Sequence, residues 1–168
     1  MSPFRRLALV IVLMLGLGAG FWGLWPSVGE RFARLLIPAE VETISTAELA
    51  AALVGDRPPL LLDVRAPEEF EVSHIPGAMN FPPGSPVTDV IRNAQAVVVY
   101  CSVGVRSGFE AVRLAPESER VYNLDGAVFR WAKEGRPLVN RSGPIGRVHP
   151  YDALWGRLLP PELRATRP

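Results

Sequence analysis

Residues 96–107 read AVVVYCSVGVRS and bring a strand, a cysteine and a helix start next to one another. Ala96–Tyr100 is a continuous apolar run, which is typical of a strand buried on both faces of a parallel sheet. Cys101 follows at the carboxyl end of this strand. The next residues form a short loop, and Ser107 is a suitable N-cap for a helix that we predict over Ser107–Ala115.

Strands and helices alternate on both sides of this stretch. Ser45 and Glu48 form a capping box at the start of one helix. The predicted strands are Val41–Ile44, Leu60–Val64, Ala78–Phe81 and Val121–Leu124, and the predicted helices are Ser45–Val54, Val87–Ala94 and Ala127–Glu134. This alternation predicts an α/β fold with a central, mainly parallel sheet.

Composition excludes several classes of protein. The chain has 168 residues, 48% of them hydrophobic, which suits one globular domain. Of 18 basic residues, Arg5 and Arg6 precede Pro26, so 16 remain against 17 acidic residues and nucleic acid is not an expected partner. Cys101 is the single cysteine, so an intramolecular disulfide is impossible. With only two histidines a zinc site is improbable, and we expect neither metal nor cofactor.

Residues 1–27 carry the pattern of a membrane anchor. Leu7–Trp25 is a run of nineteen residues without a charge; at about 1.5 Å per residue it approaches the ~30 Å of a hydrocarbon core. Arg5 and Arg6 precede this run, and tryptophans close its far end. The positive-inside rule and the aromatic belt therefore predict one transmembrane helix in the cell inner membrane, with the domain facing the periplasm.

Two other interpretations of this segment stay open. Gly18, Ala19 and Gly20 could form the cleavage site of a signal peptide, after which the protein would be secreted to the periplasm. A buried core helix fits less well, because the segment has four glycines and no polar face. Residues 28–40 then form a linker that leads into the domain.

The surroundings predicted for Cys101 favour a reactive thiolate. A loop wrapped over a helix N-terminus directs backbone N–H groups into one concavity, and the helix dipole adds positive potential there. Arg106 would lower the pKa of the cysteine further, and Gly104 permits the tight turn. The competing interpretation is that Cys101 is a small buried apolar residue, as a lone cysteine often is.

Four linked motifs and a closing helix resemble the rhodanese homology domain in content and order. They are Leu61-Leu62-Asp63-Val64-Arg65, Glu68-Glu69-Phe70, His74-Ile75-Pro76-Gly77-Ala78 with Asn80, Cys101 to Arg106 with Ser107, and Asp125-Gly126 followed by Trp131. The resemblance covers about residues 41–139. One departure is Ser73, where the family commonly has glycine before the histidine.

The resemblance implies a rhodanese-like three-layer fold and a sulfurtransferase. Cys101 would be the catalytic residue, taking a sulfane sulfur as a persulfide from a small donor such as thiosulfate. The acceptor would be a thiol, sulfite, cyanide or an acceptor protein. The substrate-binding loop would comprise Ser102, Val103, Gly104, Val105, Arg106 and Ser107, with the backbone amides of 102–106 stabilising the persulfide and Arg106 orienting the anionic donor.

The same resemblance assigns supporting roles to other residues. Asp63 and Arg65 would form a scaffold pair near the loop, and His74 would belong to a structural turn rather than act as a base. Trp131 would pack in the core.

Two other functions must be weighed against sulfur transfer. Cysteine phosphatases and the related arsenate reductases place five residues between cysteine and arginine, because their loop surrounds a tetrahedral oxyanion; here four residues separate Cys101 from Arg106. A non-enzymatic binding or regulatory module at the membrane is the main alternative, although such domains usually lose the cysteine that this chain keeps.

Residues 140–168 form a basic C-terminal extension. Pro150 could begin a short amphipathic helix with apolar residues on one face; these are Tyr151, Leu154, Trp155, Leu158 and Leu159. This stripe is expected to pack on the domain. The membrane surface or a protein partner are the alternatives.

Overall fold

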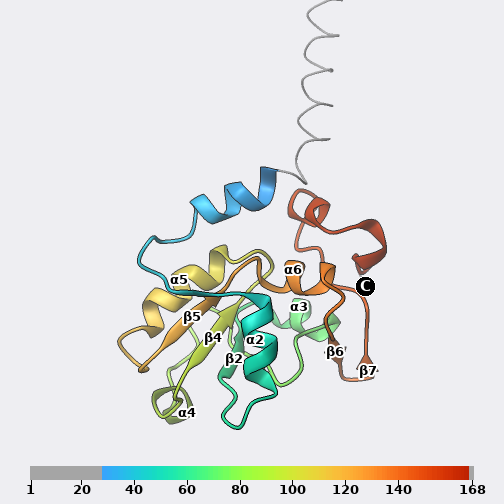
Figure 1. Ribbon diagram of the computed structural model, residues 1–168. Coiled ribbons are helices and arrows are strands. Elements are labelled where there is room, and N and C mark those ends of the chain that lie inside the picture. The colour runs from blue at the N-terminus through green and yellow to red at the C-terminus, as the bar shows by residue number, and fades with distance from the viewer. Residues whose placement is uncertain (1–27, 167–168) are drawn as a thin grey trace, which may run out of the picture.

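A computed structural model describes residues 28–166 and contains a five-stranded parallel sheet (Figure 1). The strands are β1 (Thr43–Ile44), β2 (Leu60–Asp63), β3 (Met79–Asn80), β4 (Val97–Tyr100) and β5 (Val121–Leu124). Their order is β1-β5-β4-β2-β3, and every neighbouring pair is parallel. The predicted α/β class and parallel sheet are confirmed.

Helices cover both faces of this sheet and complete three layers. They are α2 (Thr46–Leu53), α3 (Pro67–Val72), α4 (Asp89–Arg92), α5 (Val105–Leu114) and α6 (Ala127–Lys133). One core cluster joins Val98 and Tyr100 to α2 and α6, while the other joins Val97 and Val99 to α4 and α5. Alternate side chains of β4 thus point to opposite faces of the sheet, as the pleat of a strand requires. All four residues of β4 are buried.

The capping box at Ser45 is confirmed, but the start of α5 differs from the prediction. The Ser45 hydroxyl accepts from the Glu48 amide, and the Glu48 carboxylate accepts from the Ser45 amide. Helix α5 begins at Val105 with Gly104 as its N-cap, so the assignment of Ser107 as N-cap is wrong. Gly104 has a φ of +99°, and this left-handed conformation turns the chain into the helix before Ser107 is reached.

The predicted anchor Leu7–Trp25 lies outside the described residues. Within residues 28–166, none of the helices is long and apolar enough to cross a membrane. Residues 28–35 are helical and contact the domain. Arg34 donates two hydrogen bonds to the Asp125 carboxylate, at 3.1 and 2.9 Å, and Glu30 forms ion pairs with Lys133 and Arg130.

The C-terminal extension does not form the α-helix predicted from Pro150. Strand β6 (Val139–Asn140) leads into it and forms a hairpin with β7 (Gly143–Pro144), and two 3₁₀ helices follow, η1 (Trp155–Leu158) and η2 (Pro161–Leu163). Tyr151 has a φ of +65°, which is incompatible with the first turn of a right-handed helix. The apolar residues nevertheless pack on the domain core, as expected: Leu158 and Leu159 are buried there, and Leu154 and Trp155 lie against it.

Candidate active site at the end of strand β4

Cys101 lies where the sheet topology predicts a ligand site. It follows β4 directly, and the register pairs Tyr100, the last residue of β4, with Asp63, the last residue of β2. Ligands of open α/β sheets bind at such carboxyl ends. The cysteine is only 1% exposed, and the Gly104 N–H donates to its sulfur at 3.2 Å.

Neighbouring elements fix the backbone of the loop after Cys101. The amides of Val128 and Phe129, in the first turn of α6, donate to the carbonyls of Cys101 and Ser102, both at 3.1 Å. These carbonyls are thereby held toward α6. The first turn of α6 therefore fixes the start of the loop.

Asn123, a buried residue of β5, holds the other end of the loop. Its side-chain amide donates to the Gly104 carbonyl at 3.0 Å, and the Ser107 hydroxyl donates to its Oδ1 at 2.7 Å. Ser107 is therefore buried behind the loop, where its hydroxyl orients Asn123. Its backbone lies inside α5, which explains why its side chain cannot cap the helix.

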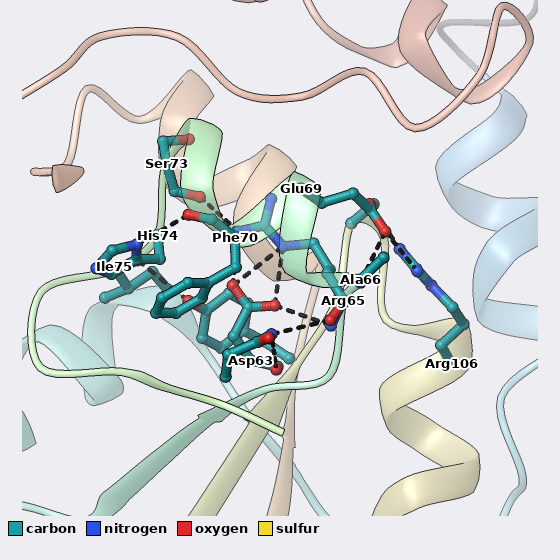
Figure 2. A network of polar contacts seen from close by, with 12 residues as sticks. Asp63, Arg65, Ala66, Glu69, Phe70, Ser73, His74, Ile75 and Arg106 are labelled. Atoms are coloured by element: carbon teal, nitrogen blue, oxygen red, sulfur yellow. Dashed lines mark hydrogen bonds and ion pairs between the residues drawn. The ribbon is translucent and has the colours of Figure 1, made fainter. Parts of the chain in front are cut away.

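Arg106 is already engaged by a carboxylate. Its guanidinium donates to both oxygens of Glu69, at 2.7 and 2.9 Å (Figure 2). It also donates to the Ser102 hydroxyl at 3.0 Å. Burial raises the pKa of Glu69, but the hydrogen bond and charge of Arg106 outweigh it and the pKa of this carboxyl falls below its ordinary value. Glu69 is therefore an anion that occupies part of the Arg106 guanidinium.

Sequence reasoning assigned no role to Glu69, although it lies in one of the quoted motifs.

Burial lowers the pKa of Arg106, whereas the Glu69 hydrogen bond and the nearby charges of Cys101 and Glu69 raise it more, so the pKa stands above its ordinary value. The guanidinium keeps its charge beside Cys101. It has five N–H donors, of which three are directed at Glu69 and Ser102.

Asp63 and Arg65 form the scaffold pair that the resemblance implied. Both side chains are 0% exposed, and the guanidinium donates to both Asp63 oxygens and to the Ser73 carbonyl. Asn80 donates to the Arg65 carbonyl at 2.9 Å. Figure 2 shows this network beside the Glu69–Arg106 pair; Glu69 lies in α3, and Ser73 directly follows that helix.

His74 has structural contacts, in agreement with the expected turn. Its ring stacks on Phe70, with centroids 3.8 Å apart and planes 4° apart, and Nδ1 lies 3.0 Å from the Phe70 carbonyl. Its backbone exchanges two hydrogen bonds with Val139. Trp131 is 2% exposed and belongs to the core, as predicted.

A small cavity of about 120 Å³ opens beside Cys101. Its walls include residues of the loop, Arg106, and two aromatic residues of the C-terminal extension, Tyr151 and Trp155. Sequence reasoning placed these aromatic residues on a packing stripe and did not connect them to the site. Among residues 28–166, no cluster of three His, Cys, Asp or Glu residues is arranged to hold a metal ion.

Comparison with known proteins places this geometry in a family. A model of the rhodanese-like domain matches residues 45–134, more than half of the chain. The chain belongs to the rhodanese-like domain family. A sulfurtransferase of Allochromatium vinosum is 33% identical over 106 residues, a match that covers 61% of this chain and 99% of the relative.

Solved structures show the same fold. A thiosulfate sulfurtransferase of Pseudomonas aeruginosa superposes with a TM-score of 0.55 at 22% identity, covering 77% of this chain and 24% of that one. A rhodanese-related protein of Thermoplasma volcanium superposes with a TM-score of 0.50 at 24% identity, covering 58% and 97%. The rhodanese-like domain and its sulfurtransferase relative support a sulfurtransferase-type role for this protein.

Proposed function

We propose that the protein moves a sulfane sulfur from a donor such as thiosulfate to a nucleophilic acceptor through a persulfide on Cys101. The observation that carries this proposal is the position of the Cys101 sulfur. It lies beside a small cavity, accepts a hydrogen bond from the Gly104 amide at the start of α5, and has the charged Arg106 nearby. Backbone donors and a fixed cation are the groups that stabilise an anionic sulfur.

The first half of the reaction loads the cysteine. The Cys101 thiolate attacks the outer sulfur of thiosulfate, and the bond between that sulfur and the sulfonate sulfur breaks. Sulfite leaves with the electron pair, and Cys101 becomes a persulfide. Arg106 binds the sulfonate oxygens through the donors that Glu69 does not use, and the Gly104 amide stabilises the sulfur anion.

The second half of the reaction transfers the sulfur from the Cys101 persulfide to the acceptor. A thiolate, sulfite or cyanide acceptor attacks the terminal sulfur of the persulfide. The bond between the two sulfurs breaks, and its electron pair returns to Cys101 as the thiolate. No separate oxidant or reductant is consumed over the whole cycle, because the donor supplies sulfur that is already at the sulfane level and the acceptor supplies the electron pair for its new bond to that sulfur.

Turnover of thiosulfate with cyanide tests this mechanism. Cys101→Ser replaces the polarisable nucleophile by a poor one, so turnover should be abolished while the thermal midpoint stays close to that of the unmodified chain. Retained turnover would overturn the proposal. If the domain is a non-enzymatic binding module, neither the unmodified chain nor Cys101→Ser should turn over thiosulfate.

We also propose that Leu7–Trp25 anchors the domain in the inner membrane with the domain in the periplasm. The uncharged run and the two preceding arginines support this topology. The helical residues after the run also expose apolar side chains, Val28 and Leu35 among them.

Protease added to intact spheroplasts should degrade the domain, and carbonate should not release the full-length protein from the membrane. Burial of an apolar span is not screened by ions. A protected domain would reverse the orientation. A soluble form beginning near Phe21 would establish signal cleavage instead.

A further inference from the structure

Two aromatic side chains of the C-terminal extension close the cavity beside Cys101. Tyr151 lies over the Arg106 guanidinium, whose carbon is 4.6 Å from the ring centroid, and Trp155 forms a neighbouring part of the wall. Tyr151 is 42% exposed whereas Cys101 is 1% exposed, so Tyr151 stands at the mouth and the cysteine at the base. We call Tyr151 and Trp155 the aromatic lid.

Short-range contacts hold the turn that carries the lid. The Asp152 carboxylate accepts from the amides of Leu154 and Trp155, both at 2.8 Å, and the Tyr151 amide donates to His149 Nδ1 at 3.1 Å. A Cβ added at Gly156 would lie 2.8 Å from the Pro150 Cβ, so the two ends of the turn touch. The two lid residues are therefore presented as one fixed unit.

The N-terminal helical segment supports the lid from outside. Phe32 stacks on Trp155, with ring centroids 6.5 Å apart and planes 21° apart. The segment carrying Phe32 is tied to the domain by the Arg34–Asp125 ion pair. Figure 1 shows the blue helical residues 28–35 and the red C-terminal segment together at the same end of the molecule.

The small size of the cavity limits what can reach the sulfur. The cavity volume is about 120 Å³, which is small for a ligand pocket. An acceptor must bring its nucleophilic atom to the terminal sulfur of a persulfide at the base of this cavity. A compact anion or a slender thiol fits, while substituents near the thiol of a bulky acceptor meet the aromatic lid.

We propose that Tyr151 and Trp155 are specificity-determining residues that restrict the sulfur acceptor of Cys101 to small or slender nucleophiles. This inference rests on the proposed sulfur transfer and names the acceptor class of the same site. Neither residue contributes an atom to the reaction. Their effect is steric, so their removal should change discharge to bulky acceptors more than loading of the cysteine.

The test is single-turnover discharge from the full-length protein after loading with thiosulfate and removal of excess donor. Two thiols serve as probes, 2-mercaptoethanol as the small acceptor and glutathione as the bulky one. High ionic strength screens attraction between Arg106 and the glutathione carboxylates. The variants are Trp155→Ala, Trp155→Phe and Tyr151→Ala, with Phe109→Ala as control, because Phe109 is 60% exposed on α5 and does not line the cavity.

The ratio of the glutathione rate to the 2-mercaptoethanol rate should rise about tenfold in Trp155→Ala and Tyr151→Ala, by less in Trp155→Phe, and remain unchanged in Phe109→Ala. Loading by thiosulfate reports the proposed function separately, since a wild-type chain that takes up no sulfur overturns both proposals. Normal loading with an unchanged ratio in the lid variants overturns the lid alone. If Trp155→Ala fails to fold, Tyr151→Ala decides the question, because its side chain is partly exposed and contributes less to the core.

Discussion

Two arginine–carboxylate pairs stand side by side in this protein, one sealed and one open to the cavity. Asp63 and Arg65 are both 0% exposed, whereas the Arg106 side chain that holds Glu69 is 29% exposed. A sealed pair cannot contact a substrate directly, so we assign it to the scaffold. An arginine that reaches a cavity can exchange part of its contact with a carboxylate for an anionic ligand.

The largest expected effect is on the sealed pair. Arg65→Met leaves Asp63 buried without its counterion, and we expect a loss of about 3–5 kcal/mol in the free energy of unfolding. Urea denaturation measures it. The double variant Asp63→Leu/Arg65→Met removes both charges and should recover part of the loss. A loss below about 1 kcal/mol in the single variant is the level of a surface pair. It would show that burial does not make the Asp63–Arg65 pair more important for stability than the open pair.

Arg106→Ala should affect catalysis more than folding. Removing a charge-assisted contact to the donor is expected to lower kcat/KM for thiosulfate by about 10- to 100-fold. The unfolding midpoint in urea should fall less than in Arg65→Met, because the Arg106 side chain is 29% exposed whereas Arg65 is sealed, although the loss of the ion-pair partner of Glu69 still lowers it. Equal proportional losses of activity and stability would assign Arg106 to the scaffold alongside Arg65.

The Glu69–Arg106 pair also predicts a pH dependence of stability. The pKa of folded Glu69 lies below its ordinary value of 4.5, so this carboxylate contributes stability that is fully present above that value and is lost as pH falls through the folded pKa. The difference in unfolding free energy between the unmodified chain and Glu69→Gln should therefore shrink as the solution is acidified below pH 4.5.

Glu134→Gln provides a matched control for that titration. Burial raises the pKa of Glu134, but hydrogen bonds from Thr46 and Arg136 bring it below the ordinary value. Its side chain is 37% exposed against 4% for Glu69, so solvent screens its contribution and the pH-dependent difference should be smaller. A larger effect from Glu134 would contradict the importance given to burial.

The smallest effect is expected at the surface. Arg34 makes a two-pronged contact with Asp125 like those of the two inner pairs, but its side chain is 52% exposed. Arg34→Ala should lower the free energy of unfolding by about 1 kcal/mol or less. Thermal denaturation in low and high salt measures it, and a loss similar to that of Arg65→Met would refute the ranking by exposure.

Local patterns predicted the parts of this structure that local physics controls. The apolar run before Cys101 became a fully buried strand, and Ser45 with Glu48 formed the capping box, because both depend on residues within a few positions of one another. The partner of Arg106 could not be derived from spacing, since Glu69 is 37 residues away. The motif Glu68-Glu69-Phe70 was recognised in the sequence, but nothing in it indicated that Glu69 pairs with Arg106.

The C-terminal extension shows how tertiary packing overrides helical spacing. Tyr151, Leu154, Trp155 and Leu158 recur at helical intervals, yet Tyr151 adopts a φ of +65° and the residues after it form only short 3₁₀ turns. Contacts of Tyr151 with Arg106 and of Trp155 with Phe32 join parts of the chain that no sequence pattern connects. The sequence pattern therefore could not predict that these aromatic residues form a wall of the cavity.

The most direct test of the central claim is the intact mass of the protein after incubation with thiosulfate and removal of the excess. The protein should gain the mass of one sulfur atom, and fragmentation should locate that atom on Cys101. Addition of cyanide should remove it and release thiocyanate, and Cys101→Ser should gain nothing. A wild-type chain whose mass stays unchanged, or one that carries sulfur when Cys101 is absent, would contradict the account.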